Sequence, residues 1–316
     1  MSEVPGKTYF SGLSQKTGFK SDSLEKVYRM MTILRRIGEL PELTDRLALK
    51  GGTAIQGLYF GFKRLSVDID LNYVGNVEKE QMLRDREEIR KNLLYLFRDL
   101  EYIADKPVSM YAEEQFNVHF KNCGGGTDRL KLEINYLERL PVIGTIKGVI
   151  KHPFMDLEDV GVLSYPPEEL YAGKMRAVIV RGTPRDVFDA DLIARSVHGL
   201  NENLLRKTTL FYLTMQSRDV RTIGTDAIER VKEVDWHNNL IPLLSRNDHI
   251  DIDSVKENVL TMANRFLDLS VREKKFFDIL YSDRRVEPDL LFDDEPVSKM
   301  LNRHPAIVWR LQQLGK

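Results

Sequence analysis

The stretch from residue 47 to residue 72 limits what this chain can fold into more than any other part of it. It reads LALKGGTAIQGLYFGFKRLSVDIDLN: a short apolar run, the turn Gly51-Gly52-Thr53, a segment of helix length, and an alternation of apolar and acidic residues from Val67 to Leu71. Alternation with a period of two predicts a half-buried strand. In such a strand Asp68 and Asp70 project from one face, while their apolar neighbours are buried on the other.

These residue types suit a site for a nucleotide and a metal ion. Two adjacent carboxylates repel each other, and Mg²⁺ relieves that repulsion while it also takes phosphate oxygens as ligands. A glycine pair lets backbone N–H groups approach a phosphate at the start of the next helix. We therefore expect Gly51, Gly52 and the hydroxyl of Thr53 to bind phosphate, with Thr53 also the helix N-cap. Ser66, on the face of the two aspartates, is expected to add a hydrogen bond.

Each motif alone has a plainer interpretation, because a lone Gly-Gly is usually a turn and a lone Asp-x-Asp is usually a solvated strand edge. Their fixed order, with fifteen residues between Gly52 and Asp68, favours the functional interpretation.

Further along, residues 116–120 and 130–136 alternate in the same way and predict the two strands of a hairpin, joined by a turn that contains Gly124-Gly125-Gly126. On the second strand one face is apolar and the other carries Lys131, Glu133 and Asn135. Glu133 is thus an acid on the polar face of a strand that could lie beside the Asp68–Asp70 strand, or else an ordinary exposed glutamate.

The second half of the chain has a helical pattern. Pro167 suits the first turn of a helix that runs to Arg181, and residues 185–197 predict the next helix. Lys174 and Arg181 lie seven residues apart, on one expected face. A basic face and the acid Asp186 could grip a triphosphate or an acceptor, but a surface with ordinary ion pairs accounts for them equally well.

Length and composition set the remaining expectations. The 316 residues suffice for two domains, and we expect an α/β domain over residues 1–165 and a helical domain over residues 166–316, with residues 1–21 as a loose polar arm. The net charge of −1 indicates no global field for nucleic acid, although a local patch can suffice. The single cysteine, the lack of a signal peptide and the lack of a membrane-length apolar run favour a soluble, cytoplasmic protein without a membrane partner.

Four ordered motifs resemble the AbiEii/AbiGii toxin family of nucleotidyltransferases, within the polymerase-β-type superfamily. They are Lys50 to Ala54, Arg64-x-Ser66-x-Asp68 to Leu71, Lys174 in a helix, and Arg185-Asp186-x-x-Asp189. The resemblance implies an α+β fold: an N-terminal polymerase-β-like nucleotidyltransferase domain, with a mixed sheet and flanking helices, and then an α-helical C-terminal domain that completes the active-site cleft. It also implies the toxin of a toxin–antitoxin or phage-defence pair, with a cognate antitoxin.

The resemblance further implies roles for single residues. Asp68, Asp70 and Glu133 would hold Mg²⁺, with Glu133 alternatively accepting the proton of the attacking hydroxyl; Lys174 would neutralise phosphate charge. Asp186, favoured by its place at a helix start, and Asp189 are both candidates for the family's functional aspartate, and Arg185 for nucleotide binding.

The donor would be an NTP and the acceptor RNA, specifically the 3′ end of tRNA. A basic rim for RNA is expected from Lys63, Arg64, Arg176, Arg181 and Arg185. Transfer to a protein or a small molecule, or nucleotide binding without catalysis, remain the alternatives.

Overall fold

The computed structural model describes residues 4–196, 199–216 and 218–314. The chain forms two compact units. The first contains Met1–Arg139, Thr145–Ser164 and Leu240–His249; the second contains Leu140–Gly144, Tyr165–Asn239 and Ile250–Lys316. Residues 140–144, which precede the boundary expected at residue 165, thus belong to the second unit. Residues 240–249, which follow it, belong to the first.

The first unit is built on a mixed sheet with the strand order β1-β2-β6-β5-β3, with β4 also paired to β5. Its strands are β1 (Leu47–Lys50), β2 (Asp68–Tyr73), β3 (Ile103–Ala104), β4 (Val108–Ser109), β5 (Glu113–Lys121) and β6 (Thr127–Asn135). A separate hairpin contains β7 (Ile146–Ile150) and β8 (Val160–Ser164). The helices of the first unit are α1 (Lys7–Thr17), α2 (Ser21–Glu39), α3 (Pro41–Thr44), α4 (Gly51–Ile55) and α5 (Lys79–Asp99). A π-helical turn, Gln56–Phe60, continues α4.

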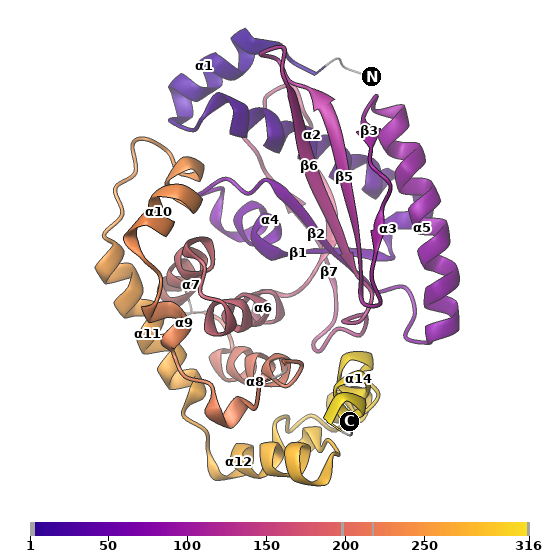
Figure 1. Ribbon diagram of the computed structural model, residues 1–316, viewed down its shortest axis with the longest axis vertical. Coiled ribbons are helices and arrows are strands. Elements are labelled where there is room, and N and C mark those ends of the chain that lie inside the picture. The colour runs from indigo at the N-terminus through magenta and orange to yellow at the C-terminus, as the bar shows by residue number, and fades with distance from the viewer. Residues whose placement is uncertain (1–3, 197–198, 217, 315–316) are drawn as a thin grey trace. The chain divides into compact units, whose positions relative to one another are not determined.

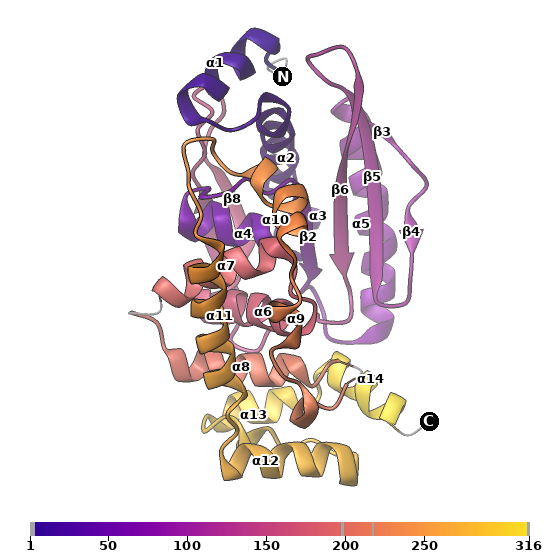
Figure 2. The same cartoon turned by 60° about the vertical axis from the view of Figure 1, so that its left-hand side comes forward.

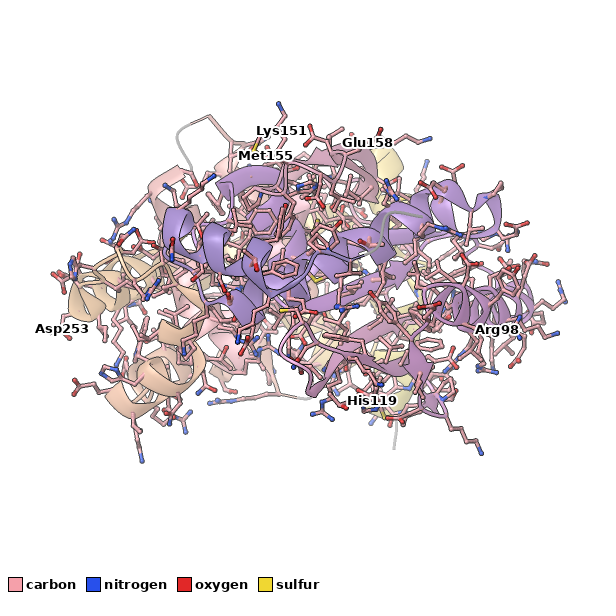
Figure 3. The ribbon with its side chains drawn as sticks, turned by 90° about the horizontal axis from the view of Figure 1, so that it is seen from above. Arg98, His119, Lys151, Met155, Glu158 and Asp253 are labelled. Atoms are coloured by element: carbon pink, nitrogen blue, oxygen red, sulfur yellow. The ribbon has the colours of Figure 1, made fainter. Side chains whose placement is uncertain are left out.

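The period-two pattern correctly predicted which face of the sheet is buried. Ile69, Leu71, Leu132 and Ile134 are at most 1% exposed. Helix α5 covers this apolar face, where the rings of Phe97 and Phe116 lie 6.0 Å apart (Figure 2). The opposite face of β5 carries polar side chains, and one of them, His119, lies at the outer margin of the view in Figure 3.

The expectation of a loose arm over residues 1–21 is wrong. Residues 7–17 form α1, and the side chain of Phe10 is completely buried against the ring of Tyr28, 5.8 Å away. Helix α1 ends at Gly18, whose φ of 77° is easily reached only by glycine. One aromatic anchor in a polar segment outweighs the segment's average composition.

The second unit is helical (Figure 1). Its α-helices are α6 (Pro167–Val180), α7 (Pro184–Ser196), α8 (Glu202–Leu213), α9 (Asp226–Glu229), α10 (Glu233–Asn239), α11 (Ile252–Leu267), α12 (Val271–Asp278), α13 (Glu295–Leu301) and α14 (Pro305–Leu314). Short 3₁₀ turns at Val220–Thr222 and Pro288–Leu290 and a π-helical turn at Ile279–Asp283 connect them, and the 3₁₀ turn Ile241–Leu243 belongs to the first unit. Helix α6 buries most of its surface, because residues on nearly every side of it are enclosed. Over the described residues, no helix is both long and apolar enough to cross a membrane.

Candidate active site

The two aspartates of β2 lie in the middle of the polar face of the sheet. Asp68 is paired with Lys131 of β6, and Asp70 lies between Lys50 of β1 and Glu133 of β6. Residues that pair directly across strands place their side chains on the same face. Both aspartates are half-buried, as the sequence pattern predicted.

The first glycine of the turn is required by Asp70. Gly51 has a φ of 70°, and a Cβ built on it would lie 2.3 Å from Oδ2 of Asp70. Any side chain at this position would therefore be strained and would also displace the carboxylate. The glycine turn and the acidic strand, fifteen residues apart in the sequence, are in direct contact in the fold.

The second glycine has a different neighbour. A Cβ at Gly52 would lie 2.5 Å from Nη2 of Arg64 and 2.9 Å from Oγ of Ser66. Arg64 is only 2% exposed and donates a 2.9 Å hydrogen bond to the carbonyl of Leu65. Its guanidinium is thus held inside the unit beside the glycine turn, and the expectation that Arg64 belongs to an exposed basic rim is wrong.

Thr53 does not cap the helix as expected, because Lys50 is the N-cap residue of α4. The side chain of Thr53 is fully buried, and its hydroxyl donates a 2.6 Å hydrogen bond to the backbone carbonyl of Asp68. This bond ties α4 to the start of β2. The hydroxyl thereby positions the strand that carries the aspartates, while Ser66, 5% exposed, lies next to Gly52.

Glu133 lies beside Asp70 in the register, but its carboxylate is engaged by a lysine. Nζ of Lys131 lies 2.8 Å from Oε1 of Glu133. Burial, together with the negative charge of nearby Glu133, raises the pKa of Glu113. Within the described part of the chain, no three His, Cys, Asp or Glu side chains are grouped so that they could hold a metal ion. Lys131 was placed on the polar face by the sequence, but its contact with Glu133 was not foreseen.

The donor set still suits a divalent cation. Asp68 and Asp70 offer hard carboxylate oxygens from one strand face, and Mg²⁺ needs only one or two protein carboxylates when substrate phosphates complete its shell. The pair fits Mg²⁺ without Glu133. At Glu133 a cation would meet the positive charge of Lys131.

The second unit holds a buried cluster of opposite charges. Nζ of Lys174 lies 2.9 Å from Oδ1 of Asp186 and 2.9 Å from Oδ2 of Asp189, and all three side chains are less than 10% exposed. Arg181 adds a 2.6 Å bond from Nε to Oδ2 of Asp186. Burial opposes ionisation of Asp186, but the charges of Lys174 and Arg181 prevail and hold its pKa far below the usual range.

This cluster revises the expectation of a basic helix face. Lys174 is inside the unit, paired with two acids, whereas Arg181 is mostly exposed. Both aspartates that the sequence left as alternatives contact Lys174, so the structure makes them parts of one cluster. Arg185 is half-buried at the start of α7.

A buried glutamate that sequence reasoning missed lies on the same helix. The carboxylate of Glu169 accepts hydrogen bonds from the N–H groups of Val142 and Ile143 at 2.8 and 2.7 Å, and from the hydroxyl of Tyr212 at 2.7 Å. Burial raises the pKa of Glu169, which is 2% exposed. An acid in the first turn of a helix is ordinarily explained by its interaction with the helix dipole, and no local pattern predicts the contact of Glu169 with residues 142–143.

The comparison with protein families is decisive for identity. Residues 32–258 match the model described as "Nucleotidyl transferase AbiEii toxin, Type IV TA system". The chain belongs to this family. It is a nucleotidyltransferase, as its motifs predicted, and its family is one of type IV toxin–antitoxin systems.

A solved structure agrees with the fold of this AbiEii-family chain. MenT4, a nucleotidyltransferase toxin from Mycobacterium tuberculosis, is 14% identical and superimposes with a TM-score of 0.65, over 98% of this chain and 99% of that one. The match confirms the expected α+β fold with its helical C-terminal region. A CdnC–HORMA-deltaN complex from Escherichia coli matches at 11% identity over 97% of this chain and 98% of that one, but its TM-score of 0.26 carries no argument. A comparison with curated protein sequences gives no match.

Proposed function

We propose that this AbiEii-family toxin transfers a nucleotide from an NTP to an RNA acceptor, the 3′ end of tRNA, with Mg²⁺ held by Asp68 and Asp70. One observation carries the proposal: the carboxylate of Asp70 lies directly against Gly51, so that two acids and a glycine turn share one place on the sheet. A nucleotide that is bound through its phosphates at the turn would have those phosphates next to the two carboxylates.

The residues of this site have separable tasks. Asp68 and Asp70 bind the metal, which when bound supplies positive charge to the phosphates of the donor. The backbone of Gly51 and Gly52 binds phosphate oxygens, and the hydroxyl of Ser66 beside Gly52 adds a hydrogen bond. Thr53 keeps the aspartate strand against α4 through its bond to the carbonyl of Asp68.

The proposal keeps Glu133 as metal ligand or proton acceptor, and the ammonium of Lys131, 2.8 Å from its Oε1, opposes both roles by its charge. Lys174 remains the candidate for neutralising phosphate charge, with Asp186 and Asp189 holding its ammonium in place. Arg185 remains a candidate for nucleotide binding.

The test incubates the purified protein with Mg²⁺, total RNA and each labelled NTP in turn, for the wild type, Asp68→Asn and Asp70→Asn. Label that enters a tRNA-sized band in the wild type, and in neither variant, supports the proposal and identifies the nucleotide. Asp105→Asn, which removes an exposed carboxylate of the same unit, is the matched control and should transfer like the wild type. Label on protein or on a small molecule instead would show that RNA is not the acceptor. Nucleotide binding without any transfer would show that the protein binds nucleotide without catalysis.

The RNA acceptor has its own signature. Binding to single-stranded RNA loses affinity with salt at a log–log slope of roughly 0.7 per phosphate contact. A transfer rate that does not change between low and high salt, at subsaturating acceptor, would point to a small acceptor.

The family also implies a partner in the cell. We propose a cognate type IV antitoxin that relieves growth arrest caused by this chain. Expression of the wild type should arrest growth, Asp70→Asn should not, and co-expression of the antitoxin should restore growth of the wild type.

A further inference from the structure

The ammonium of Lys131 contacts one of the three carboxylates proposed as metal ligands, and Lys131 shares the strand face of the other two. The register places Lys131 directly opposite Asp68 and one row from Asp70. Its Nζ lies 2.8 Å from Glu133, and its side chain is 38% exposed, so that it is neither locked in the core nor fully solvated.

The electrostatics of Lys131 agree with this position. Burial lowers the pKa of Lys131, but the hydrogen bond to Glu133 and the charge of Glu133 raise it by more. The charges of Asp68 and Asp70 raise it further. The acids of this face thus favour the charged form of Lys131.

Another lysine of the face is differently engaged. Lys50, which pairs with Asp70 in the register, has its Nζ 3.7 Å from Glu138. Glu133, in contrast, lies 2.8 Å from Nζ of Lys131, at salt-bridge distance.

We infer that Lys131 is the resident counter-cation of the acidic site, which admits a divalent cation tightly only when nucleotide phosphates are present to receive the lysine ammonium. The inference rests on the proposed metal-binding role of Asp68 and Asp70. A metal ion alone would meet a positive charge at the place where it must bind. A nucleotide brings phosphate oxygens that bind a flexible lysine well, so the ammonium can leave Glu133 for them.

Metal and nucleotide then bind with positive coupling, and Lys131 is the residue that creates it. Each ligand must raise the affinity for the other by the same factor. Lys131 acts here as a positioning residue, because it controls which cation the carboxylates hold before any reaction begins.

The experiment measures binding of Mg²⁺ or Mn²⁺ calorimetrically, with and without a non-hydrolysable NTP analogue, so that it does not depend on turnover. Lys131→Met should bind the metal alone about tenfold or more tightly than the wild type, because a nearby positive charge is gone. The same variant should lose most of the enhancement that the analogue gives. Lys131→Arg keeps the charge and should retain the weak binding of metal alone.

Two controls make the result specific. Lys121→Met removes an exposed cation of the same hairpin, on β5, and should bind metal like the wild type. Thermal unfolding of Lys131→Met should show a cooperative transition, and Mg²⁺ alone should raise its Tm more than it raises that of the wild type. Lys131→Gln provides a second variant should the methionine disturb folding.

The outcomes separate this inference from the function that it rests on. If Asp68→Asn and Asp70→Asn lose metal binding while Lys131→Met binds metal alone no better than the wild type, the inference is overturned and the metal site stands. If the wild type binds no metal even with the analogue, or if the aspartate variants bind it normally, both are overturned.

Discussion

The sheet face and the helical cluster of this protein contain the same charged residue types, but they suit opposite functions. On the sheet, Asp68 and Asp70 are half-buried, and Lys131 is partly exposed. In the helical unit, Lys174 and Asp189 lie 2.9 Å apart and are nearly inaccessible to solvent. Charges open to solvent can exchange one partner for another, whereas buried charges are costly to separate. The sheet region is suited to ligands that come and go, and the helical cluster to holding a fixed geometry.

The largest effect, on the transfer rate, is expected at the solvent-accessible aspartates of the sheet. Asp68→Asn or Asp70→Asn should lower the transfer rate by about 10³-fold or more, because a metal supplies several kcal/mol of charge stabilisation that an amide cannot bind in its place. The free energy of unfolding should hardly change, since one of two repelling carboxylates has been neutralised. Initial rates and urea denaturation of the same samples test both halves; transfer at the wild-type rate contradicts the metal assignment.

The buried cluster should show the reverse pattern. Lys174→Met leaves Asp186 and Asp189 without their shared cation, and removal of one partner from a buried ion pair costs about 3–5 kcal/mol of stability. Urea denaturation measures it. Lys207→Met is the matched comparison, because Lys207 bonds at 2.8 Å to an aspartate that is 66% exposed, and surface pairs contribute about 0–1 kcal/mol.

The transfer rate of a folded Lys174 variant tests the second role proposed for this residue. If its ammonium neutralises phosphate charge, its loss adds about 2.7–4 kcal/mol to the barrier. A folded variant with an unchanged rate would confine Lys174 to the structural role.

The contrast between the regions also shows what could be predicted from sequence. Period-two alternation predicted the strands around Ile69 and Leu132, because apolar and polar residues alternate along a half-buried strand. Motif order predicted that the glycine turn and the two aspartates belong to one site, but not the contact of Gly51 with Asp70. The interior position of Lys174 did not follow, because α6 buries most of its surface and its helical period does not single out one face.

Other features depended on contacts between distant residues. Phe10 anchors α1 through Tyr28, although the surrounding composition is polar. Glu169 binds N–H groups some 26 residues away. The ion pair of Lys131 with Glu133 is local, but the pattern gave only their shared face and not their contact. Sequence periodicity reports faces, and the choice of partner on a face is made by the fold.

A smaller effect is expected at the glycine that links turn and acid. Gly51→Ala places a Cβ where Asp70 Oδ2 lies and forces alanine to a φ of 70°, which costs about 1–2 kcal/mol for the backbone alone. The rate should also fall, because the carboxylate must move. Gly125→Ala is the matched control: its φ is 88°, but no atom lies within 4 Å of the added Cβ, so it should lose stability without losing rate. Equal transfer rates for the two variants would show that Gly51 has no role in the site.

The last prediction concerns acid, since Asp186 affects the pH dependence of stability only below pH ~4, and it tests the contrast from the helical side. The pKa of Asp186 is lowered in the folded protein despite its burial, because Lys174 and Arg181 favour the carboxylate. A lowered pKa means that the stabilisation is complete above the unfolded value near 3.9 and is lost as the pH falls below it. Between that value and the lower folded pKa the unfolded chain binds about one proton more, so this residue removes about 1.4 kcal/mol per pH unit. Asp186→Asn should reduce the slope of unfolding free energy against pH by that amount below pH ~4, as measured by urea denaturation at several pH values. An identical slope in the variant would mean that the buried cluster does not hold Asp186 ionised.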